Sequence, residues 1–189
     1  MHGKRPKNMI MKRFFPILLL SLALASCSVS PGKHEKGPTF RLPDMEMPEN
    51  HLSFNEIEGY NQYRIVATHY RTDKKELRYV LANNTAFDAL SKGLLPLPEG
   101  SKVVKIGWKV KKMAKFGAAL EAEKVQRVEY MIKDSARFSG NPGNWGYARF
   151  VRQNGKYRPW DKGTAGCIAC HNTAGQEQDF LFSRYQKMH

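Results

Sequence analysis

Cysteine and acidic side chains are scarce in this sequence, and long apolar runs are almost missing. Three cysteines among 189 residues cannot build a disulfide framework, so the fold must rest on a hydrophobic core. Only 17 acidic residues stand against 31 lysines and arginines, which gives a formal charge of +14 at pH 7. No internal repeat is present, which argues against a solenoid. A globular domain with a basic surface is therefore expected.

The first residues have the layout of a secretion signal. Five lysines and arginines precede an apolar run over residues 14–25. This run is shorter than the roughly twenty residues that cross a bilayer, so a spanning helix is the weaker alternative. The stretch Leu-Ala-Ser-Cys that ends at Cys27 resembles the bacterial lipobox, which implies a lipoprotein signal peptide over residues 1–26 and an acylated Cys27. The open alternative is an ordinary signal cleaved near Ala25.

Cleavage before Cys27 would leave 163 residues, enough for one domain. Residues 27–50, rich in Pro, Gly, Lys and Glu, are predicted to be a tether, and residues 51–189 the folded domain. Loss of five basic residues lowers the formal charge to about +9. We expect a lipid-anchored, periplasm-facing protein of the cell envelope, for which nucleic acid is not a partner. Its basic surface suits anionic lipid or an acidic redox partner, and a merely solvated surface is the default interpretation.

Alternating and β-rich segments predict a series of antiparallel strands. The predicted strands are 64–70, 76–82, 102–111, 124–133 and 145–152. The first two flank a polar turn and predict a hairpin, and an Asn154-Gly155 turn follows the last. In 102–111 the apolar side chains share one face, which places Lys105 on the opposite face as a solvated strand lysine.

Helices are predicted to be few and short. They are a short helix within 50–63, a helix at 86–92 between N-cap residues and Gly93, a helix around Cys167, and a last helix over 177–186. Strands that follow one another in sequence, with helices packed at one face or end, indicate the α+β class. The predicted fold is a mainly antiparallel sheet with packed helices.

The segment Cys167-Ile168-Ala169-Cys170-His171 is a Cys-x-x-Cys-His motif, the attachment signature of c-type haem. Two thiols separated by two residues on a helical turn reach the two vinyl groups of one porphyrin edge. The adjacent imidazole then lies under the iron. We therefore predict one covalent haem c on Cys167 and Cys170, with His171 as the proximal iron ligand. Haem is attached to such motifs after export, so the secretion signal and the motif support each other.

Three other uses of the two cysteines are weaker. A zinc site needs four ligands, and the remaining histidines form no paired motif with this one. A redox dithiol belongs beside a βαβ pattern, which is missing, and a structural disulfide is the third alternative. The sequence does not identify the sixth ligand of the iron. Candidate sixth ligands are Met113, Met131, Met188, His69 and His189.

Several segments that surround the haem motif resemble one family. They are LRYVLAN at 77–83, PEGSKVVK at 98–105, VEYMIKDSARF at 128–138, NWGYARF at 144–150 and DFLFSRY at 179–185. In this order, and with the haem motif near the C-terminus, they resemble cytochrome P-460 and its relative cytochrome c-prime-beta over roughly residues 60–185. The resemblance implies a homodimer with mainly antiparallel sheet and a five-coordinate haem.

The two branches of this family imply different functions. The P-460 branch has a lysine-to-porphyrin cross-link that supports hydroxylamine oxidation, and Lys105 matches that lysine by position. Such an enzyme also needs a distal carboxylate to accept protons. Asp161 is the only carboxylate between Val151 and the haem motif, and it has no evident place over the iron. The other branch binds nitric oxide and carbon monoxide beneath phenylalanines. The candidates for such a cap are Phe54, Phe87, Phe116, Phe138 and Phe150.

The sequence thus predicts an exported c-type haem protein that binds or redox-processes small nitrogen species such as nitric oxide or hydroxylamine. The enzymatic version is a hydroxylamine oxidoreductase that uses a Lys105-modified haem. The alternative is an electron-transfer cytochrome with six-coordinate iron. Trp108 and Trp145 are interpreted as packing residues, and Gly146 as a position where haem or backbone comes close.

Overall fold

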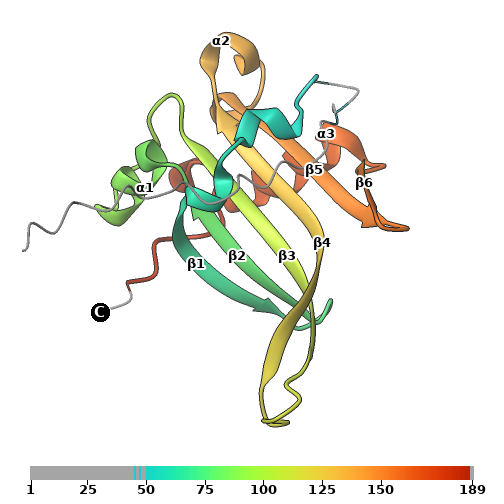
Figure 1. The fold of residues 1–189 in the computed structure, drawn as a ribbon. Helices are drawn as coiled ribbons and strands as arrows, with labels where there is room; N and C mark the ends of the chain where they lie inside the picture. Colours follow the sequence, from blue (N-terminus) through green and yellow to red (C-terminus); the bar gives the residue numbers. More distant parts are fainter. Residues whose placement is uncertain (1–44, 46, 48–49, 188–189) are drawn as a thin grey trace, which may run out of the picture. The chain divides into compact units, whose positions relative to one another are not determined.

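A six-stranded antiparallel sheet organises the part of the chain that the computed structural model describes, residues 45, 47 and 50–187 (Figure 1). Each strand pairs with its neighbour in sequence, in the order β1-β2-β3-β4-β5-β6. The strands are β1 Arg64–Arg71, β2 Glu76–Ala82, β3 Lys102–Lys112, β4 Leu120–Lys133, β5 Trp145–Gln153 and β6 Lys156–Pro159. Short turns join β1 to β2 and β5 to β6, as antiparallel pairing allows, whereas α1 lies in the connection from β2 to β3 and α2 in that from β4 to β5.

The described residues all fall within the unit Gly37–His189. The predicted signal peptide, Cys27 and most of the predicted tether lie outside them, as do Met188 and His189. Of the predicted tether, residues 45, 47 and 50 are described, and Met47 is buried in the core. Within the described residues, no helix has the length and apolar character required to span a bilayer.

The predicted strands are all present, and the predicted α+β class is confirmed. β4 begins four residues before the predicted start, and β6 was not predicted. The turn between β5 and β6 contains Asn154 and Gly155, both with positive φ, as the Asn-Gly pair indicated.

The α-helices are α1 Asn84–Ser91, α2 Ser135–Phe138 and α3 Gly163–His171, of which only α2 was not predicted. The Asn83 side chain caps α1, and Gly93 follows that helix with φ +69°. Five 3-10 turns complete the fold: η1 Phe54–Ile57, η2 Tyr60–Gln62, η3 Pro142–Asn144, η4 Asn172–Ala174 and η5 Gln176–Gln178.

The helix predicted over 177–186 is wrong. After η5 the chain is extended, because Asp179 and Phe180 both have positive φ, of 50° and 61°. This left-handed conformation cannot continue a right-handed helix. The tail instead runs to the edge of the sheet, where the Gln186 amide N–H donates to the Val66 carbonyl at 2.8 Å.

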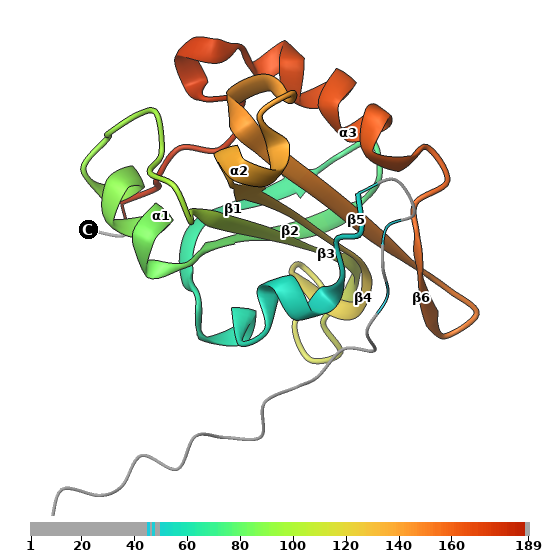
Figure 2. The ribbon, with the colours of Figure 1, turned by 90° about the horizontal axis from the view of Figure 1, so that it is seen from above.

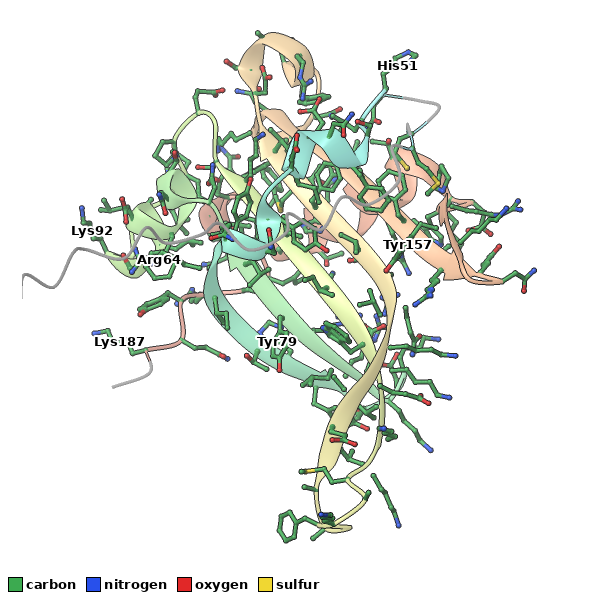
Figure 3. All side chains as sticks on the ribbon, viewed as in Figure 1. His51, Arg64, Tyr79, Lys92, Tyr157 and Lys187 are labelled. Atoms are coloured by element: carbon green, nitrogen blue, oxygen red, sulfur yellow. The ribbon has the colours of Figure 1, made fainter. Side chains whose placement is uncertain are left out.

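Both faces of the sheet are covered, and each covers a separate apolar core. Figure 2 shows α3 and the C-terminal segment on one face and η1 with η2 on the other. On the η1 face, Phe54 stacks on Phe150 with 4.2 Å between ring centroids, and Tyr157 packs edge-on against Phe54 at 5.6 Å. Figure 3 labels Tyr157 on β6. On the α3 face, the core includes Trp145 and Leu181. Successive side chains along a strand therefore point alternately into these two cores, and neither face of the sheet is simply solvated.

Gly146 in β5 faces the ring of Phe138, not the haem or backbone expected from the sequence. A Cβ atom at this position would lie 2.3 Å from Phe138 Cε2. Phe138 is buried and belongs to the core on the η1 face. The glycine therefore allows α2 to close against the sheet.

We expect Gly146→Ala to lower the free energy of unfolding by about 1–3 kcal/mol, because the ring of Phe138 must be displaced. Gly140→Ala is the matched control, since nothing lies within 4 Å of a Cβ at that position. Urea unfolding of both variants checks this. Equal midpoints would contradict the close packing of Phe138 on Gly146.

Candidate haem site

A cavity of about 450 Å³ lies between the sheet and the segment that runs from α3 to the C-terminus. Its apolar wall includes Val66, Val80, Leu90, Val103, Met131, Ala148, Leu181 and Phe182. Its polar lining includes His69, Arg71, Arg78, Lys105, Glu129, Arg149 and the motif residues Cys167, Cys170 and His171. The volume falls in the range usual for cofactor pockets, and a mainly apolar wall with a few polar groups is typical of them.

Helix α3 presents the three motif residues to this cavity. Spacings of three and four residues place Cys167, Cys170 and His171 on one side of the helix. Close packing holds the helix in place, because a Cβ at Gly166 would lie 2.9 Å from the ring of Trp160. Cys167 is partly buried and Cys170 is exposed, and both thiols are free.

The His171 ring is oriented by its backbone partner. Nδ1 lies 2.7 Å from the carbonyl oxygen of Phe180, which can only accept, so Nδ1 carries the proton. The ring also contacts Tyr147 and Phe182, with centroids 4.9 and 5.3 Å away. Burial lowers the pKa of His171, although the Phe180 carbonyl opposes this shift. The neutral ring thus keeps the Nε2 lone pair free for a metal.

The Cys167 thiol is not an activated nucleophile. Burial, and then the negative charge of Glu129, raise its pKa to about 11. Redox dithiols work with a lowered pKa, because the thiolate is the reactive form. This shift argues against the redox alternative.

In the part of the chain that the structure describes, no group of three or more His, Cys, Asp or Glu side chains is arranged to hold a metal ion.

Lys105 is not the solvated strand lysine that the alternation indicated. It lines the cavity, and its side chain is 26% exposed. Its ammonium group forms an ion pair with Glu129, which is 15% exposed and lies directly opposite on β4. The earlier interpretation failed because the α3 face of the sheet is covered as well. A charged side chain on that face must therefore find a partner.

Glu129 lies within a cluster of cations. Its Oε1 is 3.3 Å from Arg149 Nε and 3.4 Å from Arg127 Nε. Arg127 continues to Glu76 at 2.6 Å, while Arg149 stacks over Trp160, with 3.8 Å between its Cζ and the ring centroid. Burial disfavours the charged carboxylate, but the positive charges outweigh it, so the pKa of Glu129 is lowered. Glu129 is therefore an ionised, charge-compensated carboxylate inside the cavity.

Glu129 was missed because the search for a carboxylate covered only the segment just before the haem motif. The signal was nevertheless in the sequence. Glu129 alternates with Val128 and Tyr130, and antiparallel pairing of the two predicted strands places it beside Lys105. Asp161 does not line this cavity.

The candidate sixth ligands and the candidate capping phenylalanines differ in whether they line the cavity. Of the possible sixth ligands, His69 and Met131 line the cavity, Met113 is partly exposed near the β3–β4 turn, and Met188 and His189 lie outside the described residues. None of the five phenylalanines suggested as a cap lines the cavity. Phe54, Phe138 and Phe150 belong to the other core, Phe87 lies on α1, and Phe116 is 61% exposed.

The family model described as Cytochrome P460 matches residues 57–183, which include every strand and the haem motif. The chain belongs to the cytochrome P460 family. A comparison with curated proteins finds none that matches. Membership of this family implies a haem cofactor.

The residues of this cytochrome P460 protein fit such a cofactor. Cys167 and Cys170 would hold the porphyrin edge, and His171, with its proton fixed on Nδ1, would bind the iron. The apolar wall would enclose the ring, and the buried ion pair of Lys105 with Glu129 supplies polar groups in the same space. The Cys-x-x-Cys-His motif and the cavity are thus chemically consistent.

We expect acid to weaken the folded state partly through Glu129. Its folded pKa lies below the ordinary value of 4.5, so its contribution is complete above that pH and is lost as the pH falls through the lower, folded value. Glu129→Gln should cost roughly 1–3 kcal/mol at pH 7, because it leaves Lys105 and Arg149 without their carboxylate. The cost should shrink at acid pH.

Urea unfolding between pH 3 and pH 7 measures this difference. Glu121→Gln is the matched control, since Glu121 pairs with Lys111 at 3.4 Å on an exposed part of the β3–β4 hairpin. A constant difference between wild type and Glu129→Gln over the whole range would show that the carboxylate is not stabilised by its neighbours.

Proposed function

We propose that this protein carries one covalent haem c on Cys167 and Cys170, with His171 as the proximal ligand, and that it oxidises a small nitrogen substrate, of which hydroxylamine fits best. One observation carries the proposal. A lysine that matches the cross-linking lysine of cytochrome P-460 and an ionised carboxylate lie in contact inside the cavity that the haem motif lines.

In the proposed reaction the haem accepts electrons and a side chain accepts protons. The haem, when bound, accepts the electrons that leave the nitrogen of the substrate. Electrons leave an N–H compound easily only if its protons leave too, so a base must stand in the cavity. Glu129 is ionised at neutral pH and lines the cavity, so it is the proposed proton acceptor.

The charge on Lys105 would control how basic Glu129 is. As a free ammonium group, Lys105 is the closest cation to this carboxylate and helps to hold its pKa low. A lysine nitrogen bonded to a porphyrin carbon would no longer carry that charge. Glu129 would then keep Arg149 and Arg127 but lose its main partner, and its pKa would rise. The cross-link would thereby make Glu129 a better base.

A second function is favoured by a different observation. His69 and Met131 line the same cavity, and either side chain suits a sixth iron ligand. Burial, followed by the charges of Arg78 and Lys105, lowers the pKa of His69, so its imidazole is neutral and able to bind a metal. Six-coordinate iron would make the protein an electron carrier. An open sixth position without a cross-link would instead suit reversible binding of nitric oxide.

The cellular setting is part of the proposal. An N-terminal signal with a lipobox-like end supports export and acylation at Cys27, which would anchor the haem domain to a membrane and face it to the periplasm. Family resemblance supports a homodimer. A redox partner must remove the electrons, and a basic surface suits an acidic one.

Optical spectra and intact mass of the protein, produced with the haem-attachment machinery, test the haem chemistry. We expect a ferrous Soret band shifted far to the red in wild type and in Lys109→Ala, and an ordinary high-spin band in Lys105→Ala. Lys109 is the control because it lies four residues along the same strand, forms an ion pair with Glu123 at 3.4 Å and is half exposed. An ordinary spectrum in wild type with ready nitric oxide binding would leave a gas-binding protein, and a low-spin spectrum would favour electron transfer.

Hydroxylamine oxidation tests the role of Glu129. Glu129→Gln should lower kcat by about 100-fold or more while the red-shifted band remains, because a general base contributes roughly that much. Glu121→Gln should leave kcat unchanged. Equal rates in wild type and Glu129→Gln would show that another group accepts the proton.

A further inference from the structure

A buried ion pair lies beside the haem cavity and is not used by the chemistry proposed above. The Lys133 ammonium donates to both Asp179 oxygens, at 2.6 and 2.8 Å, and the two side chains are only 8% and 3% exposed. Lys133 ends β4, whereas Asp179 lies in the tail after α3. The pair therefore ties the tail to the sheet.

Asp179 is held by more than its lysine. Its Oδ2 accepts the Leu97 backbone N–H at 2.8 Å. The indole N–H of Trp145, a fully buried side chain, is 3.0 Å from the Asp179 carbonyl oxygen and 3.3 Å from Oδ1. Three elements far apart in sequence thus converge on one residue. Such an arrangement leaves Asp179 little freedom to move.

This convergence holds the backbone in an uncommon conformation. Asp179 and Phe180 have φ of 50° and 61°, and a bulky residue such as phenylalanine rarely adopts the left-handed region. Residues of this kind persist only where their surroundings hold them. Gly143 makes room for the result, because a Cβ there would lie 2.8 Å from Phe180 Cδ2.

The conformation directs one backbone group at the haem site. The carbonyl of Phe180, the residue directly after Asp179, accepts the proton of His171 Nδ1 at 2.7 Å. Without the left-handed pair, the helical continuation over 177–186 would engage this carbonyl within the helix. The Lys133–Asp179 pair therefore holds the residue next to the one whose carbonyl orients the proposed proximal histidine.

We propose that Lys133 and Asp179 are positioning residues that fix the Phe180 carbonyl against His171 and so set how strongly this histidine donates to iron. The inference rests on the proposed role of His171 as the axial ligand. A hydrogen bond from Nδ1–H to a fixed acceptor makes the imidazole a more electron-rich ligand and stabilises ferric iron. Burying an ion pair brings little stability by itself, which leaves positioning as its use.

The decisive variant is Lys133→Met/Asp179→Asn. It removes one positive and one negative charge together, so the net charge near the haem is unchanged, and the amide oxygen can still accept the Leu97 N–H. The single variant Lys133→Met would leave Asp179 buried without its cation and is expected to be much less stable than the double variant. The control is Lys111→Met/Glu121→Gln, which removes an exposed pair.

Resonance Raman spectra of the ferrous holoprotein and its reduction potential are the readouts. In the double variant we expect covalent haem by mass, an iron–histidine stretching band at lower frequency, and a higher reduction potential than wild type. The control should match wild type in all three. An unshifted band and potential in the double variant would overturn the inference, since the pair would then be merely structural.

Three further outcomes keep the inference testable. If the double variant does not fold, Asp179→Asn alone is used, because its amide oxygen can still accept from the Lys133 ammonium and the Leu97 N–H. Its reduction potential is not compared, since it removes one charge, but its iron–histidine frequency is expected to fall, and an unshifted frequency would equally overturn the inference. If wild type shows no iron–histidine band although its optical spectrum is that of five-coordinate high-spin ferrous haem, the axial role of His171 is overturned and this inference with it. If His69 or Met131 makes the iron six-coordinate, the reduction potential alone is the readout, and an unshifted potential in the double variant overturns the inference. A normal wild-type band with unshifted variants overturns only the positioning role.

Discussion

Burial of both faces of one sheet is the constraint on which this molecule depends. A side chain on either face of β3 or β4 enters an interior, so a charge placed there needs an opposite charge nearby. Lys105 and Glu129 meet this need by lying opposite each other across the strand pair. The same constraint places them in the space that α3 and the tail enclose. The polar chemistry of the cavity thus follows from how the sheet is covered.

The tail after α3 is the second element that shapes the site. It leaves the helix through two left-handed residues, Asp179 and Phe180, and returns to the edge strand β1. On the way it supplies the carbonyl that orients His171 and the Phe182 ring that contacts it. One short segment therefore closes the cavity and orients the proposed iron ligand.

Membership of the cytochrome P460 family and the geometry of the cavity support the same function by different routes. The family implies a haem, and the oriented, neutral His171 beside two free thiols is what a covalent haem requires. The pairing of Lys105 with Glu129 favours turnover of a nitrogen substrate over simple ligand binding. His69 and Met131 keep electron transfer as the competing function, and coordination number separates the two.

The sequence by itself determined five of the six strands, the α+β class and the haem motif, because these depend on local signals. Alternation predicted β3 and β4, an asparagine cap and a glycine stop predicted α1, and the spacing of Cys167, Cys170 and His171 predicted their common side of a helix. The tertiary structure alone decided what covers each face of the sheet and therefore whether a strand side chain is buried. Lys105 was predicted to be solvated, because the sequence of one strand does not show what covers its other face. The tail was predicted to be helical from its apolar residues. The sequence does not show the long-range contacts of Asp179 that hold the tail in another conformation.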